Sequence, residues 1–119
     1  MMNTKKYQDF LKILENELLS YRWGCVYDSE KKVTLAEYGN APTENSSALP
    51  EQCNALFESS LQSKGSGCEL MAHDEQWILL MRRFTKGSLR CFILLRSGGI
   101  TTGWARDTLK DKLQEFSSN

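Results

Sequence analysis

The sequence has few of the residues on which common catalytic and metal sites depend. It holds a single histidine, His73, and four cysteines, Cys25, Cys53, Cys68 and Cys91, that form no Cys-x-x-Cys pair. Structural zinc sites take their ligands from closely spaced cysteines and histidines, so these wide spacings argue against one. We interpret the cysteines as buried thiols that pack as small apolar side chains.

The sequence also lacks an excess of charge of either sign and lacks long apolar runs. Lys and Arg together number 15, as do Asp and Glu, so no net field attracts nucleic acid or an anionic membrane. The longest apolar runs, Trp77–Met81 and Cys91–Leu95, are five residues each, whereas a membrane-spanning helix needs about 20. The N-terminal segment lacks the uninterrupted apolar stretch of a signal peptide. We expect one domain over residues 1–119, soluble and cytoplasmic, without membrane insertion or a nucleic-acid partner.

Motifs for catalysis are weak. A nucleophilic Ser or Cys needs an adjacent base, and His73 lies next to a turn, where a surface residue is the simpler interpretation. The segment Ser97–Gly103 lacks the Gly-Lys-Ser/Thr ending of a P-loop and fits a flexible joint. Arg82 and Arg83 could include an arginine finger, although a strand end that emerges into water explains them equally well. The acidic residues fall on helix faces and turns, where solvation is expected, so we predict no catalytic residue, cofactor or metal.

What the sequence does have is a strongly apolar hairpin. The runs Gln76–Phe84 and Leu89–Arg96 flank the glycine-containing turn Thr85–Ser88, which is the pattern of two antiparallel strands. Both runs are apolar on both faces instead of alternating. Such strands need cover on each side, so we predict a sheet between helices.

The remaining elements follow from periodicity and turn residues. Apolar residues recur at helical spacing in the first and last segments, which we place together on one face of the sheet, with the middle helix on the other. The strand before the long polar loop carries charge and suits a sheet edge. The predicted order is helix Lys5–Ser20, strands Trp23–Asp28 and Lys32–Tyr38, helix Pro50–Ser63, strand Cys68–His73, the apolar hairpin, and helix Gly103–Phe116.

The middle helix has an unusual outer side. Its inner side is predicted to contain Leu49, Cys53, Leu56, Phe57, Ser60 and Leu61. Its other side contains Gln52, Ala55, Ser59 and Ser63. These residues are small or uncharged, where a solvated helix face usually carries Lys and Glu. The face is either an ordinary solvent face or a close contact with a helix of a second chain.

The order of elements resembles that of the roadblock/LC7 family. Gly24–Asp28 is similar to the family's first strand, Trp77–Leu95 to its central hairpin, and Thr102–Arg106 to the entry of its last helix. The first hairpin turn, Ser29–Lys32, departs from the family by lacking a glycine. The resemblance implies an α/β fold: a profilin-like α/β/α sandwich with a five-stranded, mainly antiparallel sheet.

The resemblance also implies a function. Family members pair through the middle helix and the third strand, which here correspond to Gln52, Ala55, Ser59, Ser63, Cys68, Leu70 and Ala72. They act as non-catalytic regulatory or scaffolding modules, so the implied partners are a second copy of the chain and a small Ras-like GTPase or a larger complex. The alternative is a ligand-sensing or secretion-chaperone-like dimeric module. A third, an enzyme, would depend on His73.

Overall fold

The computed structural model describes residues 4–18, 20–41, 48–64, 69–73, 75–84, 88–98 and 102–118, with the backbone alone for 61–64, 102, 117 and 118. The predicted order of three helices and five strands is confirmed. The elements are α1 (Lys5–Glu17), β1 (Tyr21–Asp28), β2 (Val33–Gly39), α2 (Leu49–Lys64), β3 (Glu69–His73), β4 (Trp77–Arg83), β5 (Leu89–Arg96) and α3 (Thr102–Ser118).

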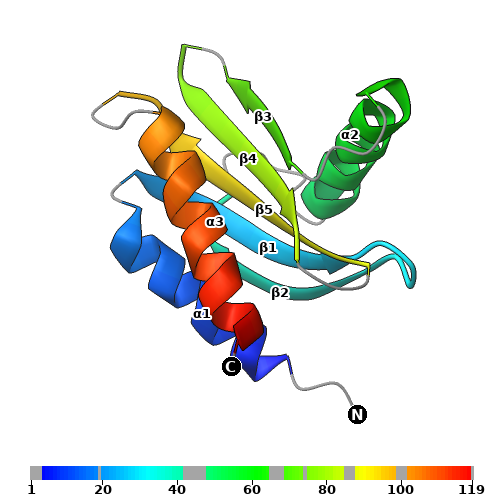
Figure 1. Ribbon diagram of the computed structural model, residues 1–119, viewed down its shortest axis with the longest axis horizontal. Helices are drawn as coiled ribbons and strands as arrows, with labels where there is room; N and C mark the ends of the chain where they lie inside the picture. The colour runs from blue at the N-terminus through cyan, green and yellow to red at the C-terminus, as the bar shows by residue number, and fades with distance from the viewer. Residues whose placement is uncertain are drawn as a thin grey trace.

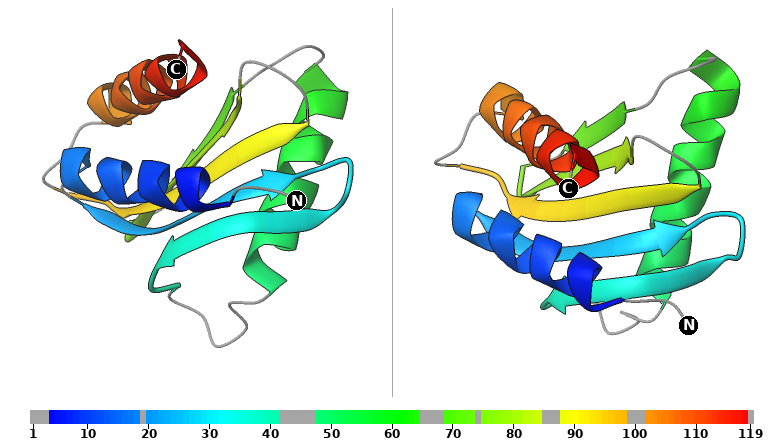
Figure 2. Two further views of the ribbon diagram at one scale, coloured as in Figure 1. Left: turned by 90° about the horizontal axis from the view of Figure 1, so that it is seen from below. Right: turned by 60° about the horizontal axis from the view of Figure 1, so that its bottom comes forward.

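The strands form one antiparallel sheet in the order β2-β1-β5-β4-β3. Helices α1 and α3 lie side by side on one face, and α2 lies on the opposite face (Figures 1 and 2). The apolar strands β1 and β5 pair at the centre of the sheet. The predicted three-layer sandwich and the edge position of β2 are confirmed, and β3 is the other edge.

Strand alternation divides the core between the two layers. On β4, Ile78 and Leu80 point into the cluster under α1 and α3, whereas Met81 belongs to the cluster under α2. Both faces of this strand are therefore apolar, and the α2 side is buried at Met81 but only half-buried at Leu79. On the α1 side, Leu11 and Leu14 are fully buried. Each such leucine stabilises the fold by about 1.5–3 kcal/mol.

Two local features of β1 and β2 explain their sequences. At Gly24, an added β-carbon would lie 2.6 Å from the Tyr21 hydroxyl and 2.7 Å from Ile93 Cδ1, so only glycine fits without displacing them. Opposite, the pairing of β1 with β2 shifts register between Val26 and Tyr27. The shift is a bulge that turns Leu35 and Ala36 into the same cluster, and both are buried.

The first hairpin turn manages without the glycine of the family pattern. Lys32 takes the positive φ of 56° that a glycine would otherwise supply. Asp28 stabilises the turn, because its Oδ1 accepts hydrogen bonds from the backbone N–H groups of Glu30 (3.0 Å) and Lys31 (3.2 Å). It also accepts one from the Ser88 hydroxyl (2.6 Å) at the start of β5. The expectation that acidic residues at turns are solvated is wrong here, since Asp28 is buried.

Candidate functional site

The outer side of α2 is a stripe of neutral side chains around one exposed leucine. Gln52, Ala55 and Ser59 are exposed, as predicted from their spacing. Leu56, predicted to face inward, is instead 46% exposed. Residues 52, 55, 56 and 59 follow the i, i+3, i+4, i+7 spacing of one helix face. The stripe is therefore more apolar than the sequence interpretation allowed.

The misplacement of Leu56 has a geometric cause. The inner side of α2 is centred on Cys53 and Phe57, which are four residues apart and 3% and 0% exposed. Leu56 precedes Phe57 by one residue, and one residue turns a helix by about 100°. Counting from Gln52 and Ser59 instead would have placed Leu56 on the outer face.

The same face of the sheet is only partly covered next to the β3 edge. Leu70, Ala72, Leu79 and Leu94 are all half-buried. Leu70, Leu79 and Leu94 border the cluster under α2, and Ala72 shares their face because it is two residues from Leu70. The helix leaves an apolar strip here that a second helix or chain could cover.

Strand β3 also presents a free edge. Its hydrogen-bonded neighbour among the described strands is β4 alone, so one row of its backbone groups is available for pairing. We call Gln52, Ala55, Leu56, Ser59, Leu70 and Ala72 the α2–β3 surface. Of the other predicted interface residues, Ser63 lies on α2 with its side chain outside the described residues, and Cys68 lies outside them altogether.

The start of β3 is fastened to two other elements by charge. The Glu69 carboxylate accepts hydrogen bonds from Arg82 on β4, its register partner, and from Arg106 on α3, and it forms an ion pair with each. Arg82 is thus engaged in an ion pair within the fold. Arg83 is exposed. This part of the structure is therefore tied to the α3 layer, on the face of the sheet opposite α2.

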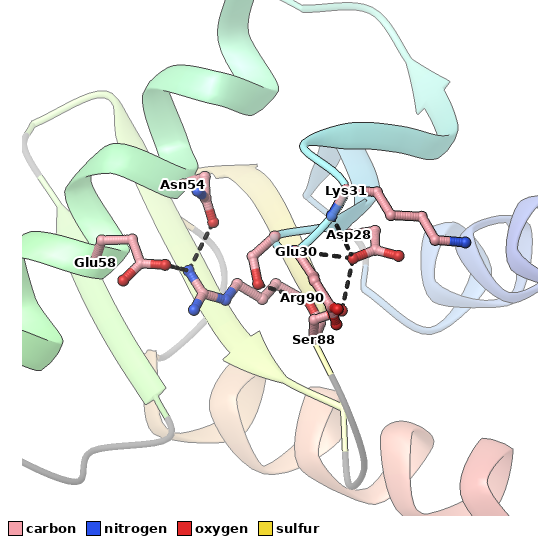
Figure 3. A network of polar contacts seen from close by, with 8 residues as sticks. Asp28, Glu30, Lys31, Asn54, Glu58, Ser88 and Arg90 are labelled. Atoms are coloured by element: carbon pink, nitrogen blue, oxygen red, sulfur yellow. Dashed lines mark hydrogen bonds and ion pairs between the residues drawn. The ribbon is translucent and has the colours of Figure 1, made fainter.

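Helix α2 is fastened to the sheet by a buried arginine (Figure 3). Arg90 on β5 is 7% exposed. Its Nη1 donates to Asn54 Oδ1 at 2.6 Å and lies 2.9 Å from Glu58 Oε1. The guanidinium lies over the Phe57 ring, 5.0 Å from the centroid. Sequence reasoning missed this residue, because arginines at strand ends are usually solvated.

The cysteine thiols of this region pack as buried apolar groups and are not poised for catalysis. Burial raises the pKa of the Cys53 thiol to about 11 and also raises the pKa of Cys25 and Cys91. The three thiols are buried, as predicted, and stay protonated at neutral pH. His73 is exposed at the end of β3. Within the described ranges, no three His, Cys, Asp or Glu residues are grouped as metal ligands, and no helix is long and apolar enough to cross a membrane.

No protein-family model matches the sequence, and comparison with curated proteins finds no match. Solved structures of roadblock/LC7 proteins, however, superpose on almost the whole chain, so the chain has the roadblock/LC7 fold. The solved structures that match are those of MglB and MglC. Myxococcus xanthus MglB gives a TM-score of 0.77 at 10% identity, over 99% of this chain and 90% of MglB.

Two further structures agree. Myxococcus xanthus MglC gives a TM-score of 0.64 at 15% identity, over 95% of this chain and 98% of MglC. The gliding protein MglB from Thermus thermophilus gives a TM-score of 0.67 at 15% identity, over 99% of this chain and 93% of that protein. At such low identities the likeness establishes the fold, and the roles of individual residues must come from the surface itself.

Proposed function

We propose that this chain is a non-catalytic, homodimeric regulatory or scaffolding module that acts on a small Ras-like GTPase or a larger complex. Two copies associate through the α2–β3 surface, with their α2 helices in contact and their β3 edges paired. The observation that carries the proposal is Leu56, a large apolar side chain left 46% exposed in the middle of a stripe of small and uncharged residues.

Three further features support the proposal. Small side chains such as Ala55 and Ser59 let two helices approach closely. The half-buried strip of Leu70 and Ala72 lies on the same face of the sheet, so one partner could cover the helix and the strip together. One solved MglB with this fold is described in a tetrameric arrangement, at a TM-score of 0.68 and 15% identity, over 99% of this chain and 92% of MglB.

Charge placed in the stripe tests the dimer. The double substitution Ala55→Arg and Ser59→Arg puts two cations on the outer side of α2 in each copy, where like charges would face each other. Both positions are exposed, so the fold is retained. Light scattering after size exclusion should give a dimer for the wild type and a monomer for the variant. Asn16→Arg on the exposed side of α1 is the control and stays dimeric.

A variant that remains dimeric would refute the α2 contact, and a wild type that is strictly monomeric at tens of micromolar would refute the homodimer. The GTPase part of the proposal needs a separate test. Small Ras-like GTPases loaded with GDP or a GTP analogue are passed over the immobilised chain, and hydrolysis of GTP is followed with and without it. Nucleotide-dependent retention is expected, and equal retention of both forms would count against regulation.

A further inference from the structure

Arg90 contacts α2 along one turn of its inner side. Its partners Asn54, Phe57 and Glu58 occupy positions i, i+3 and i+4, and each contact differs in kind: a hydrogen bond, a ring stack and an ion pair. The guanidinium is planar, and its Nη1 alone reaches both Asn54 and Glu58. These contacts therefore define both the position of α2 along its axis and its rotation about that axis.

The remaining contacts of the cluster under α2 are apolar. Cys53 and Phe57 pack against Trp23, Cys25 and Phe92, and apolar packing has little directional preference compared with a hydrogen bond. Rotation of α2 would expose part of Phe57, which is fully buried. It would also pull Asn54 and Glu58 away from the buried guanidinium, which would then lack partners.

The restraint and the candidate interface share a helical turn. Glu58 precedes Ser59 and follows Ala55 by three residues, so it borders the α2–β3 surface. Its side chain is 44% exposed, although its carboxylate reaches Arg90, whose side chain is 9% exposed. Figure 3 shows the arginine extending from β5 toward both α2 partners. The contacts of Arg90 therefore fall on the same helical turn as the side chains of the candidate interface.

We propose that Arg90 is a positioning residue that holds α2 in the one rotation at which its outer stripe and the β3 edge can meet the same partner. This inference rests on the proposed function for its consequence, association, but its structural content concerns α2 alone. Lysine is not equivalent to the arginine, since an ammonium group lacks the planar face that lies over the Phe57 ring.

The test replaces Arg90 with methionine. Removal of one partner of a buried ion pair is costly when the other charge stays buried, but the Glu58 side chain is 44% exposed and Asn54 is only half-buried, so water can hydrate both. The fold is therefore expected to survive while the directional restraint is lost. Arg83→Met is the matched control, because Arg83 is the register partner of Arg90 on β4 but is exposed.

Two readouts separate positioning from general support. Hydrogen exchange should become about tenfold faster or more for α2 amides in Arg90→Met, with β1 and β5 amides unchanged, as expected for the loss of charge-assisted hydrogen bonds. Sedimentation equilibrium should show self-association weakened by about tenfold or more. Arg83→Met should match the wild type in both, and Arg90→Lys should exchange faster than the wild type in α2.

Wild-type α2 exchange in Arg90→Met would overturn the inference, and so would faster exchange spread evenly over α2 and the sheet. Faster α2 exchange with unaltered self-association would refute the link to the interface. A monomeric wild type would refute the proposed homodimer, while the exchange measurement would still decide whether Arg90 holds α2. If Arg90→Met does not fold, Arg90→Lys decides: wild-type α2 exchange in that variant overturns the inference.

Discussion

Truncation of Leu56 to alanine should weaken self-association by an amount that the exposure of the side chain defines. A leucine transferred fully from water to a packed interior contributes about 1.5–3 kcal/mol. Leu56 is 46% exposed in one copy, so burial of the remainder in a dimer would contribute about 0.7–1.4 kcal/mol. A symmetric dimer contains the contact twice, which gives about 1.4–2.8 kcal/mol.

This free energy corresponds to a dissociation constant about 10- to 100-fold larger for Leu56→Ala. Alanine retains the β-carbon, so we expect a value toward the lower end. The dissociation constant is measured by sedimentation equilibrium over a range of protein concentrations. Chemical denaturation of the same samples reports the stability of the fold, which the loss of the buried half of the side chain will also lower.

The chain offers a matched control for this experiment. Ile13 is 47% exposed, almost the same as Leu56, but lies on α1 in the layer on the opposite side of the sheet. Ile13→Ala should therefore lower stability by a similar amount and leave self-association unchanged. Equal dissociation constants for the two variants would refute the assignment of the interface to α2, and a stronger effect of Ile13→Ala would move the interface to the α1 layer.

Two further predictions concern the hairpin of β1 and β2. Gly39→Ala should lower stability to urea by at least about 2 kcal/mol, because Gly39 has φ +105° and an added β-carbon would lie 2.4 Å from the Arg22 carbonyl oxygen. Gly98→Ala, with φ +96° but no atom within 4 Å, carries the backbone strain without the clash, and equal losses would contradict the steric explanation. Asp28→Asn should flatten the acid dependence of stability, since the Ser88 hydroxyl, aided by the N–H groups of the turn, lowers the pKa of Asp28. A carboxyl whose pKa is lower in the folded state stabilises the fold above its unfolded pKa of about 3.9, and this contribution is lost as pH falls through the folded pKa. Urea midpoints should therefore fall more steeply from about pH 5 downward in the wild type than in Asp28→Asn. Parallel curves for the two proteins would refute this role of Asp28.

The architecture could be predicted from the sequence alone because buried residues recur with the period of the helix or strand that contains them. Strand β4 is apolar on both faces since it contributes to the cluster under α1 and α3 on one side and to the cluster under α2 on the other. Leu11 and Leu14 recur at helical spacing because one side of α1 is buried. Strand ends were predicted to within a few residues. The small-residue face of α2 was also readable, because Ala55 and Ser59 stand where charge is usual.

The residues missed by sequence reasoning are those whose environment depends on distant parts of the chain. Asp28 reads as an ordinary turn residue, and its burial follows from Ser88, which is 60 positions away. Arg90 reads as a solvated strand end, and its burial follows from Asn54, 36 positions away on the helix that packs over β5. Neither partner leaves a local signal, because such contacts depend on where β5 packs in the sheet.

Local periodicity and turn chemistry thus determined which segments of this chain are helices and strands and which sides of them are dry. By spacing, Leu56 fits both the inner and the outer side of α2, and the tertiary structure decided between them: Leu56 faces outward, while Arg90 is buried beneath the helix. The physical reason is that spacing alone leaves a helix with overlapping apolar sides, and contacts with residues far away in the sequence, such as the packing of Phe57 on Phe92, select the one that faces the sheet.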